Sequence, residues 1–123
     1  MKFAEAHNNQ TFFITGYDQQ SIRINGKSFD KGLILTSNSF YSNWSAQTYA
    51  RLKVSHLNEI FTLKPELILL GTGRKQLFPN KDIYLALINS NIGFEIMNTQ
   101  AACRTFNILT ADGRNVAAAL FTH

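Results

Sequence analysis

The segment LILLGTGRKQLFP, Leu67–Pro79, decides how the chain folds. Its first four residues are all apolar, which is typical of a strand that is buried on both faces of a sheet. Gly71 and Gly73 follow, and glycine lets the backbone turn sharply or approach a ligand closely. In open α/β sheets, ligands bind in crevices at the carboxyl ends of such strands. The segment therefore predicts a buried central strand whose end borders any site.

The Gly-Thr-Gly-Arg sequence at 71–74 does not complete a nucleotide-binding motif. A dinucleotide fingerprint requires a third glycine where this chain has Gln76, and the Gly-Lys-Ser/Thr of a P-loop is absent. Two interpretations remain open. The loop is either a glycine turn between a strand and a helix, or a turn that also borders an anion site.

The chain after Pro79 alternates between helical and strand patterns. Two helices are expected, over 80–91 and 99–112, and two strands, over 93–98 and 115–121. The expected helix caps are Asn80 for the first helix and Asn98 or Thr99 for the second, with Gly93 and Gly113 as the respective stops. This order of elements favours a largely parallel central sheet with covering helices.

The first third of the chain has the pattern of an antiparallel meander. Strands are expected in TFFITGY, in SIRI and in KSFDKGLILTS, three or four in all. Asn25-Gly26 joins two of them, and this dipeptide suits a tight hairpin turn because both residues accept a positive φ. A short helix is expected from Ser55, a good N-cap residue.

Composition limits the classes of function. The 123 residues, 45% apolar and 16% charged, fit one globular domain spanning 1–123. The net charge of +4 comes from scattered lysines and arginines, so no nucleic-acid partner is expected. No stretch approaches the ~20 apolar residues of a membrane span. The absence of a signal-peptide pattern and the single cysteine, Cys103, lead us to expect a cytoplasmic protein.

The segment TQAACRTFN carries the other residues that chemistry could use. Helical periodicity places five side chains on one face, so Cys103 is expected in the core: Thr99, Ala102, Cys103, Phe106 and Leu109. Arg104 falls on the opposite side, beside Ile108, and could border a partner surface or pocket. Arg74, Arg104 and Arg114 could converge on an anion.

No catalytic or metal-binding set is recognisable. The chain has no CxxC, no HExxH and no paired carboxylates, and spacing assigns none of its three histidines, His7, His56 and His123, to Cys103 as a base. Neither a catalytic residue nor a cofactor is therefore expected.

Several segments together resemble a known family. They are SIRINGKSF, SNW, PELILLGTG, NSNIGFEIMNTQAACRTFNIL and DGRNVAAAL. On these segments the chain is similar to the domain-of-unknown-function family that includes mitochondrial respiratory complex I assembly factor 3. The resemblance implies a three-layer α/β domain, with a mixed, largely parallel central sheet, covering helices and an N-terminal antiparallel β-hairpin layer. It also implies assembly through protein contacts, with no catalytic activity established for the family as a whole.

The resemblance implies a shared surface at the GTG loop and the Cys-Arg helix. Its residues here are Gly71, Thr72, Gly73, Arg74, Cys103, Arg104 and Thr105. The favoured hypothesis is a soluble, non-enzymatic binding or assembly factor with a protein partner, for which a homodimer is plausible. The alternative is an anion-binding protein or enzyme that uses the GTG loop, Cys103 and Arg104.

Overall fold

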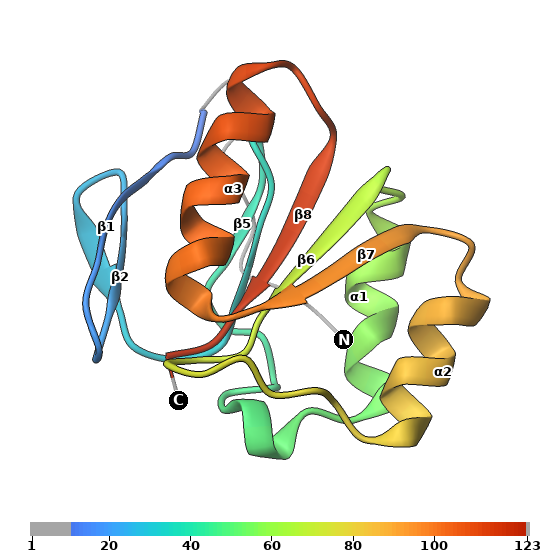
Figure 1. The fold of residues 1–123 in the computed structure, drawn as a ribbon. Helices are drawn as coiled ribbons and strands as arrows, with labels where there is room; N and C mark the ends of the chain where they lie inside the picture. The colour runs from blue at the N-terminus through green and yellow to red at the C-terminus, as the bar shows by residue number, and fades with distance from the viewer. Residues whose placement is uncertain (1–10, 123) are drawn as a thin grey trace.

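The computed structural model describes residues 11–122, which form two β-sheets and three α-helices with two short 3-10 turns (Figure 1). The strands are β1 Ile14–Tyr17, β2 Ile22–Ile24, β3 Lys27–Phe29, β4 Leu33–Leu35, β5 Phe40–Tyr41, β6 Leu67–Gly71, β7 Gly93–Met97 and β8 Val116–Leu120. The helices are α1 Leu57–Thr62, α2 Lys81–Asn89 and α3 Thr99–Ala111, and the 3-10 turns are η1 Tyr49–Arg51 and η2 Val54–His56.

The five-stranded central sheet is mixed, in the order β5-β4-β8-β6-β7. β6 pairs in parallel with both β7 and β8, whereas β4 pairs antiparallel with β8 and β5. Every residue of β8 is buried, as is β6 beyond Leu67, because both faces of the sheet are covered. The predicted central strand is thus confirmed and contacts two parallel neighbours.

The other sheet is a three-stranded antiparallel meander, β1-β2-β3, which packs against α3 and against the β5 edge of the central sheet. Figure 1 shows α3 between β1–β2 and β8, with α1 and α2 on the far side of the central sheet. The rings of Phe29 and Phe40, 4.7 Å apart and nearly perpendicular, join the two sheets. The three-layer α/β prediction with an N-terminal antiparallel layer is confirmed.

Each face of the central sheet has its own core. The core shared with α3 and the small sheet is built around Phe106, Leu69 and Ile22, and the opposite core around Trp44, Ile60 and Phe121. The predicted buried face of α3 is confirmed: Thr99, Ala102, Cys103 and Phe106 are buried and Leu109 is partly buried against the same core.

The helix caps follow the sequence at most positions. The side chains of Asn80 and Asn98 accept hydrogen bonds from the backbone N–H groups of Ile83 and Ala101, as N-caps should. Gly113 ends α3 with a φ of 82°, and the next residue, Arg114, donates its N–H back to the carbonyl of Leu109. The hairpin prediction at Asn25-Gly26 is also confirmed, with φ values of 50° and 86°.

Two local predictions were wrong, and a third, the meander of three or four strands, holds for three strands. Ser55 caps nothing, because it lies inside η2, and α1 begins two residues later at Leu57 without a side-chain cap. Gly93 does not stop α2 but begins β7, while the left-handed residue after α2 is Asn91, with a φ of 60°. The meander ends at β3, since β4 leaves it to pair with β8.

Candidate functional site

The GTG loop joins three elements at the carboxyl end of β6. The N–H of Gly73 donates to Thr99 Oγ1 at 2.8 Å, and that hydroxyl donates to the carbonyl of Phe121 at 2.6 Å. The N–H of Thr99 donates in return to the carbonyl of Gly73 at 2.8 Å. The ends of β6 and β8 are thereby tied to the first turn of α3. The Gly73 amide that an anion would use already has a partner inside the protein.

The structure explains why both Gly71 and Gly73 of the GTG loop are glycines. A Cβ on Gly71 would lie 3.0 Å from Leu120 Cδ2 and 3.0 Å from Thr99 Oγ1, which is tighter than ordinary packing allows. Gly73 has a φ of 102°, a conformation in which side chains are strained. The structural-turn interpretation of the GTG sequence accounts for both positions.

Thr72 organises the loop that follows. Its buried hydroxyl donates to the carbonyl of Lys75 and accepts from the N–H of Leu77 at 3.1 Å. The phenol of Tyr49 donates to the carbonyl of Leu77 at 2.7 Å, and burial raises the pKa of Tyr49 to about 12. The phenol therefore stays a hydrogen-bond donor at physiological pH. These contacts tie Thr72, Lys75 and Leu77 to one another and to Tyr49.

This loop forms one wall of a groove of about 750 Å³, which we call the loop groove. It is lined by Tyr49, Ala50, Thr72, Gly73, Arg74, Lys75, Leu77, Phe78 and Thr122. Leu77 is 49% exposed and Phe78 is 74% exposed, although both are large apolar side chains. Among residues 11–122, the lining holds two cationic residues and no carboxylate. Sequence reasoning missed Leu77 and Phe78, although two apolar residues directly before a proline in a polar loop were a usable signal.

Cys103 lies in the core, as its helical position predicted. Cys103 is only 5% exposed. Burial raises the pKa of its thiol to about 12, even though the neighbouring Arg104 acts to lower this pKa. At neutral pH the side chain is a protonated thiol, the form that does not act as a nucleophile. His56 is no base for it, because its Nδ1 accepts from the N–H of Lys53 at 3.0 Å on the other face of the sheet. His7 and His123 lie outside the described residues.

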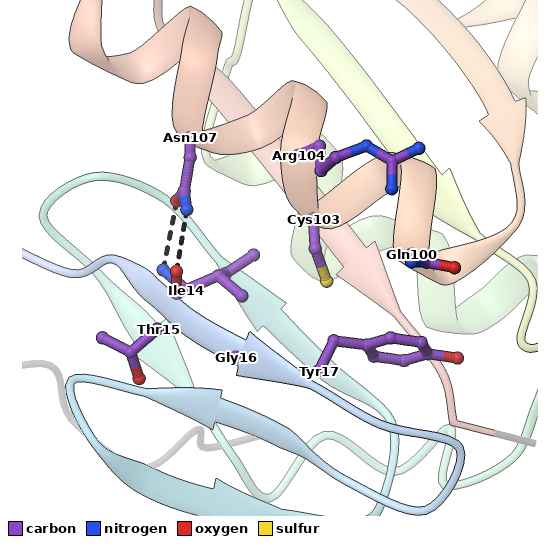
Figure 2. A pocket seen from close by; sticks show the side chains of 8 residues that line it. All are labelled: Ile14, Thr15, Gly16, Tyr17, Gln100, Cys103, Arg104 and Asn107. Carbon is purple, nitrogen blue, oxygen red and sulfur yellow. Dashed lines mark hydrogen bonds between the residues drawn. The ribbon is translucent and has the colours of Figure 1, made fainter.

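A second opening lies between β1 and α3, and we call it the strand–helix cleft (Figure 2). It has a volume of about 260 Å³, and its walls are residues 14–17 of β1 with Gln100, Cys103, Arg104 and Asn107 of α3. Asn107 holds the two walls together, accepting from the N–H of Ile14 at 3.1 Å and donating to its carbonyl at 2.7 Å. Sequence reasoning missed both Asn107 and Tyr17.

Five of the seven residues of the expected surface line one or the other of these two openings. Thr72, Gly73 and Arg74 line the loop groove, whereas Cys103 and Arg104 line the strand–helix cleft. Gly71 is buried in the sheet. Thr105 lines neither opening; its hydroxyl donates to the sulfur of Met97 at 3.7 Å.

The hypothesis that three arginines converge is wrong for Arg114. That residue follows the C-terminal end of α3 and contacts Glu66, with 2.9 Å between Nε and Oε1. Arg74 follows the opposite end of β6, beside the first turn of α3, and the helix separates the two ends by about 20 Å. Within residues 11–122 no group of three His, Cys, Asp or Glu side chains is placed to hold a metal ion.

Comparison with known proteins identifies the family. Residues 14–121 match the model of a protein family described as "Protein of unknown function (DUF498/DUF598)". The chain belongs to this family. The resemblance noted from the sequence is confirmed, since relatives named NADH dehydrogenase [ubiquinone] 1 alpha subcomplex assembly factor 3 also match, that of Drosophila melanogaster at 31% identity over 111 residues.

The alignments cover only part of each matched relative. The alignment with the Drosophila assembly factor covers 87% of this chain and 57% of that protein. A "13 kDa major membrane protein" of Francisella tularensis is 39% identical over 66 residues, 54% of each chain. The chain thus spans little more than half the length of these curated relatives.

Solved structures of bacterial proteins share the fold. A crystal structure from Bordetella parapertussis has a TM-score of 0.82 at 34% identity, covering 92% of this chain and 97% of that one. A solution structure from Xanthomonas campestris has a TM-score of 0.84 at 31% identity, covering 99% and 92%. In the part of this chain that the structure describes, no helix is long and apolar enough to cross a bilayer.

Proposed function

We propose that this protein is an assembly factor that holds a segment of a partner protein in the loop groove. The observation that carries the proposal is Phe78, a large apolar side chain that is 74% exposed and directly follows Leu77, which is hydrogen-bonded to Thr72. The names of the assembly-factor relatives support the same class of function.

The ordering of the loop matters because binding costs conformational entropy. Thr72 and Tyr49 already fix residues 72–77 through hydrogen bonds to Lys75 and Leu77. A partner that covers Phe78 therefore gains apolar burial without having to order this loop. Exposed aromatic residues on rigid supports are frequent hot spots of protein interfaces.

The charges of the groove indicate the chemistry of the partner. Within residues 11–122, Arg74 and Lys75 line the groove and no carboxylate does. The ion pairs of these residues involve other side chains, Arg23–Asp18 and Arg114–Glu66. We therefore infer a partner segment that carries apolar side chains for Leu77 and Phe78, with aspartate or glutamate beside them. Subunits of NADH dehydrogenase are the first partners to test, by analogy with the named relatives.

The test is site-specific crosslinking in cells. A photoreactive phenylalanine replaces Phe78 in one variant and Ile108 in the control, since Ile108 is 64% exposed on α3 and does not line the groove. We expect a discrete adduct from position 78 that is absent from position 108. Reversing the charges with Arg74→Glu and Lys75→Glu should abolish this adduct.

The adduct partner is then purified and its affinity measured. Phe78→Ala should weaken binding by roughly 30-fold, the effect of losing a hot spot of about 2 kcal/mol. Ile108→Ala should change the affinity less than about twofold, within the range of near-neutral interface positions. Equal adducts at both positions, or unchanged binding by Phe78→Ala, would contradict the proposal.

We also propose a cytoplasmic location and a homodimer. Buried, protonated Cys103 suits a reducing compartment, and the exposed Leu77 and Phe78 could also be covered by a second copy. Cell fractionation tests the first, and sedimentation of wild type against Phe78→Ala tests the second.

A further inference from the structure

The strand–helix cleft is separate from the loop groove, and its walls differ in polarity from base to rim. At its base lie the side chain of Ile14 and the sulfur of Cys103, both part of the buried core. Figure 2 shows the Cys103 sulfur directed into the space between α3 and β1. Since that thiol is protonated at neutral pH, the base of the cleft carries no charge. It suits an apolar group.

The rim of the cleft offers hydrogen-bond donors. In Figure 2 the side chains of Arg104, Gln100 and Tyr17 extend in the same direction. Arg104 is exposed and has no carboxylate partner among residues 11–122. Its guanidinium can donate two parallel hydrogen bonds to one carboxylate. The Gln100 amide and the Tyr17 phenol can each add another.

The electrostatics of the rim favour an anion. Burial raises the pKa of Tyr17, and the Cys103 thiol and the Asp18 carboxylate add to the effect while Arg74 opposes it, so the phenol keeps its proton at neutral pH. Arg74 therefore acts on the same phenol from the neighbouring GTG loop. In the part of the chain that the structure describes, no aspartate or glutamate lines the cleft. The nearest acid along the chain, Asp18, accepts from the amides of Gln20 and Ser21 and pairs with Arg23.

We propose that the strand–helix cleft binds a small carboxylate with a short apolar tail, the carboxylate on Arg104 and the tail against Ile14 and Cys103. The volume of about 260 Å³ fits a molecule below drug size, since drug-sized ligands occupy about 300–1,000 Å³. This site is independent of the partner groove. Its failure would leave the assembly-factor proposal intact, and the reverse also holds.

The test uses the full chain, labelled with ¹⁵N, and sodium benzoate as the probe. Amide shifts are followed during titration with benzoate, with neutral benzamide and with inorganic phosphate at constant ionic strength. We expect saturable shifts from benzoate that centre on Gly16, Tyr17, Gln100 and Arg104. Arg104→Gln should weaken benzoate binding by about tenfold or more, the effect of losing a charge-assisted hydrogen bond.

A matched control separates the site from general surface charge. Arg51→Gln makes the same change at another exposed arginine, on η1, that does not line the cleft. It should leave benzoate binding unchanged. The proposal is overturned if benzamide or phosphate binds as well as benzoate, if the shifts do not saturate, or if Arg104→Gln and Arg51→Gln behave alike.

Discussion

Gly73 and Thr99 are bound to each other in both directions, the Gly73 amide to the Thr99 hydroxyl and the Thr99 amide to the Gly73 carbonyl, each at 2.8 Å. The two residues are 26 positions apart, yet this pair fixes where the GTG loop meets α3. Both openings of the molecule depend on that junction, because the loop forms one and α3 forms the other.

Thr99→Val tests the strength of this junction. Valine keeps the shape but leaves the Gly73 N–H and the Phe121 carbonyl without their partner in a fully buried position. We expect the free energy of unfolding to fall by about 3 kcal/mol, since each unsatisfied buried group costs roughly 1–3 kcal/mol. Urea unfolding measures it. The control Thr62→Val removes an exposed hydroxyl bond to Glu59 and should cost less than about 0.5 kcal/mol.

Phe78→Ala should leave stability almost unchanged, within about 0.5 kcal/mol, because the side chain is 74% exposed. Phe106→Ala, in the fully buried core, should cost about 3–5 kcal/mol. Thermal and urea unfolding of both variants give the comparison. A large loss from Phe78→Ala would mean that this ring is required for folding and would weaken its assignment to partner binding.

Cys103 should make stability fall with rising pH in the alkaline range. Burial raises the pKa of the thiol to about 12 in the folded protein, from 9.0 for an unperturbed thiol. Between these values the unfolded chain loses the proton and the folded one keeps it, so the free energy of unfolding decreases by up to about 1.4 kcal/mol per pH unit. Below pH 9 the group should have no effect.

The measurement is urea unfolding of wild type and Cys103→Ala from pH 7 to 10.5. The raised pKa of Tyr49 has burial as its cause and is common to both proteins. The raised pKa of Tyr17 depends in part on Cys103, so Cys103→Ala also removes that part, which acts in the same direction and only near pH 10 and above. The difference between the two curves should be flat up to about pH 9 and then shrink. In parallel, an alkylating reagent should modify the native thiol slowly at pH 7.5 and rapidly in urea; rapid native modification would refute the buried-thiol assignment.

Asn107→Ala should release β1 from α3 at one residue. The Ile14 N–H and carbonyl would lose their side-chain partners, and we expect a destabilisation of about 1–3 kcal/mol with faster hydrogen exchange at Ile14. Gln100→Ala, on the same helix and exposed, should leave Ile14 protected. Equal exchange rates at Ile14 in the two variants would show that the amide clamp does not hold the strand.

The helix caps, the hairpin turn and the buried helix face could be predicted from the sequence because they depend on neighbouring residues. Asn80 and Asn98 were recognised as caps because an N-cap satisfies backbone groups two or three residues away. Asn25-Gly26 was recognised as a turn because its φ requirement is local. Cys103 was placed in the core by helical periodicity alone.

What the sequence could not predict depends on distant contacts. In the sequence, nothing distinguishes Asn107 from other helical residues. Its role depends on contact with β1, which lies 93 positions earlier in the chain. The exposure of Phe78 depends on the fold around Thr72 and Tyr49. The separation of the expected surface into two openings also depends on this fold. Ser55 was misjudged because its propensity as a cap gave way to a 3-10 turn that packs under Trp44.

The Asn107 amide also protects one edge of the small sheet from pairing with other strands. A carboxamide presents the same donor and acceptor as a peptide unit, so Asn107 occupies the place of an added strand along the open side of β1. The opposite side of that sheet ends in β3, three residues long with exposed Lys27 and Ser28. Both edges of the small sheet therefore carry features that disfavour pairing with a strand of another chain.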